Sequence, residues 1–189
     1  CDATCNEATT QQQTVTIEDQ TPLPTVALTV GSATIGEDQG VTSTTVTATL
    51  NVLSEKDITV TIGKTGTTRE TATAPLSVDY TLESTIFIPA LTQSVSITLS
   101  ALTDLLDEFD ETVIIDIVDV VNGLENSVQK QTVTISDDDD LPTVTLSIGS
   151  ININEDKVAP TSTTVTATLN TLSGRNVTVN LVKAGSALE

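Results

Sequence analysis

The chain has 189 residues, with 26 aspartate and glutamate residues against seven lysine and arginine residues, no histidine, and a formal net charge of −19. Such a charge disfavours nucleic acid and anionic lipid as partners, because both bind basic surfaces. Hydrophobic residues make up 38% of the chain, which is too many for a disordered acidic tail, and no apolar run is long enough to span a bilayer. We therefore expect a folded protein that attracts cations, does not bind nucleic acid and does not insert into a membrane.

The chain begins in a short segment that holds both cysteines, Cys1 and Cys5. They either close a small disulfide loop or are what remains of a longer segment. The rest of the chain contains no cysteine, so disulfides do not hold its fold together.

The sequence repeats itself over the length of a domain. Thr14 begins a stretch that returns at Thr132, an offset of 118 residues, and one inserted residue near Lys157 makes the offset 119 by Val46 and Val165. A repeat of this length is a domain rather than one turn of a solenoid. We divide the chain into the terminal strand of a preceding repeat (1–19), a complete domain (20–140) and the N-terminal half of the next repeat (141–189).

Alternation with a period of two residues predicts the strands. In 44–50, threonines lie on one face and Val46, Ala48 and Leu50 on the other, as in a strand with one wet and one dry face. The same reading gives strands at 14–19, 25–30, 57–62, 85–88, 94–99, 112–118, 129–135 and 143–148. The continuously apolar run 112–118 predicts a central strand, and 101–111 is predicted to be a polar loop. About seven short strands per unit indicate an all-β protein built of antiparallel β-sandwiches.

The junction between successive units is short. Only Asp137–Pro142 separates the last strand of the complete unit from the first strand of the next, and Pro24 and Pro142 stiffen equivalent junctions. We expect an extended rod that bends little.

Acidic residues gather where strands are predicted to end. The complete unit carries four such groups: Glu37-Asp38, Asp79, Asp104 through Glu111, and Asp137–Asp140. Calcium takes six to eight oxygen ligands and tolerates irregular geometry, so loops of this kind suit it if they meet at one pole. The alternative is a solvated acidic face without a metal. The preceding unit keeps only Glu18-Asp19-Gln20, and the third keeps Glu155-Asp156 without its partner loops, so neither is expected to hold a full site.

Several of these segments together resemble Calx-beta repeats, which occur in sodium–calcium exchangers, integrin β4 and bacterial surface proteins. The resemblance covers nearly all of residues 20–140. It is carried by Ile35 through Gly40, Thr71–Ala74 followed by Asp79-Tyr80-Thr81, Phe87 through Ala90, Asp104 through Val113, and Thr132 through Asp139.

The resemblance implies an immunoglobulin-like sandwich of seven strands with calcium at one pole. The positions that match the family's ligands are Glu37, Asp79, Asp104, Glu108, Asp137, Asp138 and Asp139. The chain departs from the family where Thr103-Asp104-Leu105 replaces consecutive aspartates, and where Pro75–Val78 replaces the glycine before the Asp-Tyr pair. We expect one to three calcium ions per complete unit.

The sequence does not favour an enzyme. It has no histidine, no candidate Ser or Cys triad and no glycine-rich phosphate loop. The leading hypothesis is a calcium-rigidified structural repeat of a large extracellular adhesin or surface filament, with calcium ions and neighbouring repeats or copies as its partners. The alternative is a calcium-sensing regulatory module attached to a membrane transporter. A ligand-binding adhesion tip ranks lower, because no aromatic patch or concave pocket is visible.

The third unit contains too few predicted strands to close a sandwich, so its sheet edges are expected to be exposed. Three explanations remain open: an artificial or proteolytic boundary, a piece of a longer chain, or a half-domain that another chain completes by strand addition.

Overall fold

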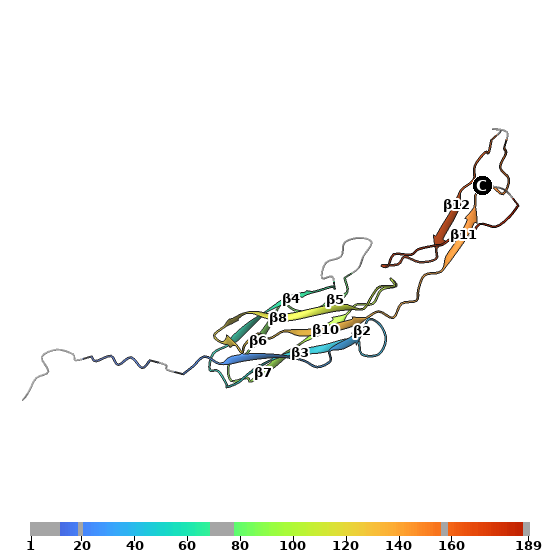
Figure 1. Ribbon diagram of the computed structural model, residues 1–189. Helices are drawn as coiled ribbons and strands as arrows, with labels where there is room; N and C mark the ends of the chain where they lie inside the picture. Colours follow the sequence, from blue (N-terminus) through green and yellow to red (C-terminus); the bar gives the residue numbers. More distant parts are fainter. Residues whose placement is uncertain (1–11, 19–20, 69–77, 156–158, 187–189) are drawn as a thin grey trace, which may run out of the picture.

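A computed structural model describes residues 12–18, 21–68, 78–155 and 159–186 (Figure 1). The cysteines Cys1 and Cys5, the segment Thr71–Ala74 and the acidic residues Asp19 and Asp156 lie outside the described residues, so the hypotheses that concern them stay predictions.

The complete unit is a sandwich of two five-stranded sheets, which Figure 1 shows packed face to face. The first sheet has the order β5-β7-β3-β1-β9, with strands β1 Thr25–Val30, β3 Ser43–Leu50, β5 Tyr80–Thr81, β7 Ser94–Ala101 and β9 Leu124–Glu125. The second has the order β2-β10-β8-β4-β6, with strands β2 Thr34–Gly36, β4 Ile58–Gly66, β6 Thr85–Ile88, β8 Glu111–Val121 and β10 Gln131–Ser136. The predicted all-β sandwich is confirmed.

The seven longer strands are those that the alternation predicts, and β8, which contains 112–118, lies in the middle of its sheet as expected. The three additional strands, β2, β5 and β9, have only two or three residues, too few for a period of two to be detected. Most pairs are antiparallel, while β1 pairs with β9 and β10 with β2 in parallel.

A core of aliphatic side chains fills the space between the sheets. All of its fully buried hydrophobic residues lie between Val26 and Ile135, and most are Val, Ile or Leu, with Tyr80 as the one aromatic member. In β3 the inward-facing Val46, Ala48 and Leu50 are buried. The complete unit therefore carries its own core and does not need the third unit to bury it.

The sequence repeat is also a structural repeat. Strands β11 Val144–Ile148 and β12 Val165–Leu169 pair antiparallel in the register of β1 with β3: Val144 faces Leu169 as Val26 faces Leu50. The turns agree as well, since the N–H groups of Gly31 and Gly149 each donate to a threonine carbonyl at 2.9 Å.

The half-unit lacks a second sheet among its described residues. Leu28 is 1% exposed, whereas its counterpart Leu146 is 51% exposed. The face of the β11–β12 hairpin is therefore exposed. Its two strands also pair only with each other among the described residues, so the expected open sheet edges are present.

Residues 12–18 form no strand, although 14–19 is predicted to be the last strand of a preceding unit. A strand requires a hydrogen-bonding partner, and residues 12–18 pair with no described strand. The assignment of domain boundaries stays a prediction. Among the residues that the structure describes, no helix has the length and apolarity that a membrane crossing requires.

The repeat provides a matched test of the core. We expect Leu28→Ala to lower the free energy of unfolding by about 2–5 kcal/mol, because it leaves a cavity between the sheets. The equivalent Leu146→Ala should cost about 0.5 kcal/mol or less, since its side chain is half exposed. Urea unfolding of both variants measures the difference, and equal losses would show that Leu146 is buried by a partner in solution.

Candidate metal centre

Strand pairing brings the acidic segments to one end of the sandwich. Strands β2 and β10 run in parallel with Gly36 opposite Ser136, so the residues that follow them, Glu37 and Asp137, leave the sheet side by side. The Glu37 N–H donates to the Ser136 carbonyl at 3.3 Å. We call this end of the module, where β2, β7 and β10 finish and β5 and β8 begin, the carboxylate pole.

Two antiparallel pairs add the remaining acids to this pole. Strand β8 runs opposite to β10 and therefore begins, at Glu111, where β10 ends. Strand β5 pairs with the end of β7, which places Asp79 beside the loop that follows β7, and the Leu102 N–H donates to the Asp79 carbonyl at 2.9 Å. Four segments that are distant in sequence thus meet in space.

The first carboxylate cluster consists of Glu37, Asp104 and Asp139, each half-buried, with one oxygen of each lying within 4.8 Å of the others. The Oδ2 atom of Asp139 is buried and has no hydrogen-bond partner among the described residues. Desolvation and the neighbouring carboxylates, Asp104 first among them, raise the pKa of Glu37 to about 8. The same two causes raise the pKa of Asp139. Burial and mutual repulsion thus disfavour the charged form of the carboxylates in this cluster.

The second carboxylate cluster consists of Asp79, Glu108 and Glu111, again with one oxygen from each within 4.8 Å of the others. Asp79 and Glu108 are 3% and 7% exposed, which is unusual for acidic residues. Their burial at the rim of the sheets argues against a merely solvated acidic face.

The other two predicted ligands lie outside these clusters. Asp137 accepts from the Glu108 N–H through Oδ1 at 3.1 Å and from Arg175 Nη2 through Oδ2 at 3.2 Å. Asp138 is exposed, and a hydrogen bond with Asp38 raises its pKa. Asp137 therefore connects the carboxylate pole to the following unit, while Asp138 faces solvent.

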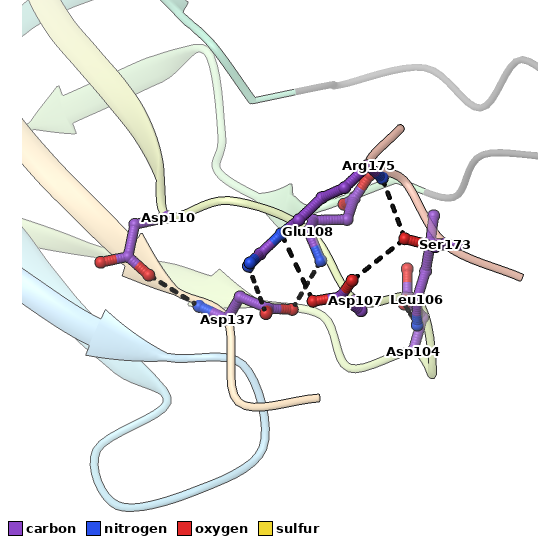
Figure 2. A network of polar contacts seen from close by, with 8 residues as sticks. All are labelled: Asp104, Leu106, Asp107, Glu108, Asp110, Asp137, Ser173 and Arg175. Atoms are coloured by element: carbon purple, nitrogen blue, oxygen red, sulfur yellow. Dashed lines mark hydrogen bonds and ion pairs between the residues drawn. The ribbon is translucent and has the colours of Figure 1, made fainter. Parts of the chain in front are cut away.

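A loop of the third unit is seated on the carboxylate pole (Figure 2). Arg175 Nε lies 3.3 Å from Asp107 Oδ1, and the guanidinium stacks over the Phe109 ring, 4.4 Å from its centroid. Ser173 Oγ donates to Asp107 Oδ2 at 3.0 Å, and the Gly174 N–H donates to the Asp107 carbonyl at 3.0 Å. Arg175 thus hydrogen-bonds Asp137 and forms an ion pair with Asp107, and its charge neutralises part of the pole.

The donor set fits a hard divalent cation. All candidate ligands are carboxylate oxygens, which calcium prefers, and the two clusters lie at loop ends whose backbone adapts to irregular coordination. The buried, unpartnered Oδ2 of Asp139 is an oxygen for which a cation would supply the missing partner. Glu37, Asp104 and Asp139 would hold one ion, and Asp79, Glu108 and Glu111 would hold another.

Sequence reasoning missed three residues of this region: Glu111, Asp107 and Arg175. Glu111 and Asp107 lie in the acidic run 104–111, but the run alone does not tell which side chains turn inward. The repeat could have pointed to Arg175, because it occupies the position of Lys56 in the repeat. Both units therefore carry a basic residue in the same loop.

The solved structures that resemble this chain include domains of Calx, one of which is described as a calcium binding domain. The chain is 19% identical to CBD12 from CALX1.2, covering 61% of this chain and 44% of that chain, with a TM-score of 0.46. It is also 19% identical to the apo-form Calx CBD1 domain, covering 61% of this chain and 99% of that one, with a TM-score of 0.45. At these values the likeness carries no argument about activity. Neither a protein-family model nor a curated protein matches the sequence.

The raised pKa of Glu37 gives a prediction for the metal-free protein. The folded state keeps the proton up to about pH 8, whereas the unfolded chain releases it near its ordinary pKa of 4.5. The unfolded state thus binds fewer protons between these values, so stability falls as the pH rises from about 5 to 8. We expect Glu37→Gln to flatten this decline, measured by urea unfolding in chelator across that range. Glu83→Gln, at an exposed site, is the control and should leave the slope unchanged.

Proposed function

We propose that this chain is a calcium-rigidified structural segment of a large extracellular adhesin or surface filament, built of repeated β-sandwich modules. The observation that carries this proposal is the carboxylate pole. It holds two clusters of three carboxylates each, at the end of the module that faces the next repeat. A sandwich that served only as a spacer would gain nothing from gathering like charges in partly buried positions.

Calcium would act on stability through the unfavourable charge of these clusters. With no ion present, the raised pKa values of Glu37 and Asp139 record the cost of holding their charges close together. An ion held by the folded state alone converts this repulsion into attraction and shifts the folding equilibrium towards the native state. The loops that carry the ligands then lose their freedom to separate.

The same pole controls the junction between modules. The linker starts at Asp137, whose carboxylate holds Arg175 of the third unit, and it passes through Asp139, a member of the first cluster. An ion on Asp139 would therefore fix the linker from one side while Arg175 fixes it from the other. We infer that the module transmits calcium binding into stiffness along the array.

The proposed role is non-enzymatic and mechanical. Millimolar calcium is available outside cells, and the sequence-level resemblance to Calx-beta repeats of bacterial surface proteins supports an extracellular location. Neighbouring repeats, or copies of the same protein, are the partners that this role requires, and strand addition to the open β11–β12 hairpin is one way in which a copy would bind.

One observation favours the alternative of a calcium-sensing module attached to a membrane transporter. Because Arg175 and the candidate ligands share one pole, an ion that repels the guanidinium would change the angle between the units. The two functions differ in what calcium does: in a structural rod it reduces motion at a fixed angle, and in a sensor it changes the angle.

Calcium should raise the melting temperature of the chain by about 5 °C or more at concentrations well above its dissociation constant, and a chelator should reverse the effect. Glu108→Gln should reduce the shift, because Glu108 belongs to the second cluster. The control Asp116→Asn should not, since Asp116 lies within β8 and pairs with Lys130 at 3.7 Å. Calorimetric titration with calcium and with magnesium completes the test, and the absence of a shift at millimolar calcium would overturn the metal proposal.

Removal of the arginine separates the rod from the sensor. In Arg175→Ala, residues 143–186 should become more mobile on the nanosecond scale in ¹⁵N relaxation, and calcium should restore less of the order than it does in the parent chain. Residual dipolar couplings of the parent chain should show the same orientation of the two units with and without calcium. A reorientation by tens of degrees would instead support the sensor.

A further inference from the structure

The pole opposite the carboxylates carries a loop equivalent to the one that seats Arg175. Residues Asn51–Lys56 correspond, at the offset of 119, to Asn170–Arg175. They lie where β3 ends, and Val52–Lys56, with Thr21–Pro24 and Asn122, line a hollow of about 310 Å³. We call Asn51–Lys56 the basic-tip loop.

Both loops share two hydrogen bonds. Asn51 Oδ1 accepts from the Thr25 N–H at 2.8 Å, and Asn170 Oδ1 accepts from the Thr143 N–H at 2.7 Å. The Ser54 hydroxyl accepts from the Lys56 N–H at 3.0 Å, as Ser173 accepts from the Arg175 N–H at 3.1 Å. The basic-tip loop therefore has part of the hydrogen bonding of its docked counterpart. The Ser54 hydroxyl donates to the Lys56 carbonyl at 2.8 Å, and on docking it would donate to an aspartate instead, as Ser173 does.

The docked counterpart shows which surface the loop fits. Ser173, Gly174 and Arg175 contact Asp107, Phe109 and Asp137 of the carboxylate pole, and the corresponding residues of the basic-tip loop are Ser54, Glu55 and Lys56. Lys56 keeps the positive charge, and its ammonium has no ion pair among the residues that the structure describes. The hydroxyl is retained as well.

We propose that the basic-tip loop is a docking surface for the carboxylate pole of another module, and that a second copy of the complete unit, whose pole carries no Arg175 loop, occupies it. The contact is head-to-tail, with Lys56 approaching Asp107 and Asp137 of the second copy. This inference rests on the proposed function as an array of modules but not on its calcium, because Arg175 contacts the pole through protein side chains alone. A heterologous contact of this kind joins modules in an open series.

The basic-tip loop has Glu55 and Lys56 where the docked loop has Gly174 and Arg175, and both differences weaken the expected contact. A Cβ at Gly174 would lie 2.7 Å from Glu108 Cγ, so Glu55 at the equivalent place requires Glu108 of the second copy to turn aside. Lysine also lacks the planar fork with which Arg175 reaches both aspartates. The natural loop should bind weakly, and Glu55→Gly with Lys56→Arg, which copies the observed junction, should bind at least fivefold more tightly.

The experiment is a nuclear magnetic resonance titration in chelator. The receiver is the ¹⁵N-labelled full chain, whose own carboxylate pole is closed by Arg175. The donor is the unlabelled chain ended after Leu141, which keeps the whole buried core but opens its pole, and which carries Lys56→Glu so that it does not bind to itself. The donor must first show the dispersed spectrum of a folded module.

The proposal predicts shifts of receiver amides in 51–56 and at Asn122, saturating at lower donor concentration for the Glu55→Gly, Lys56→Arg receiver. Lys56→Glu in the receiver, or Asp137→Asn in the donor, should abolish them. Lys130→Glu changes the charge equally, but Lys130 lies just before β10, beside Asp116 of β8, and this substitution should leave the shifts intact. The proposal is overturned if the double variant shows no shift of these amides at millimolar donor, or if Lys56→Glu has no effect on the shifts. Because no calcium is present, a failure here leaves the metal proposal standing, and a failure of calcium to bind leaves this contact standing.

Discussion

The sandwich brings several carboxylates together at one end, and the rest of the structure must offset their mutual repulsion. Strand pairing alone decides this convergence: β2 and β10 end together, and β8 begins beside them. Since these strands also bury the aliphatic core, the module cannot form its core without bringing the acids together. Part of the resulting charge is neutralised by Arg175, and protonation of Glu37 at a pKa of about 8 relieves more of it. A divalent cation would relieve it most completely.

Much of the fold was predictable from sequence, because a two-residue period reports directly on a sheet with one buried face. The threonine-alternating run 44–50 and the apolar run 112–118 appear as β3 and as part of the central strand β8. The short strands β2, β5 and β9 were not predictable, since two or three residues contain no period. The strand predicted at 14–19 is absent over the described residues 14–18. Alternation shows which side chains would share a face of a strand, but it does not show whether a neighbouring strand is present to pair with it.

The candidate site was predictable as a pole but not as a ligand set. The chain order of acidic segments and strands places Glu37, Asp104, Asp139, Asp79 and Glu108 at one end, and these are the predicted residues that the structure groups. Asp137 was equally acidic in sequence, yet the structure pairs it with Arg175. That distinction depends on a residue 38 positions away in another unit, and no local pattern carries such information. Repeat symmetry is the one sequence signal that reaches so far, since it aligns Arg175 with Lys56.

The module has different chemistry at its two ends, and this difference has a consequence for any longer assembly. One end holds the gathered carboxylates and the other holds Lys56 on the basic-tip loop. When such modules follow one another in the same direction, each internal carboxylate end faces the lysine of a neighbour, while the last carboxylate end faces none. The assembly would then have two chemically distinguishable tips. Growth by addition of copies would therefore proceed with a built-in direction.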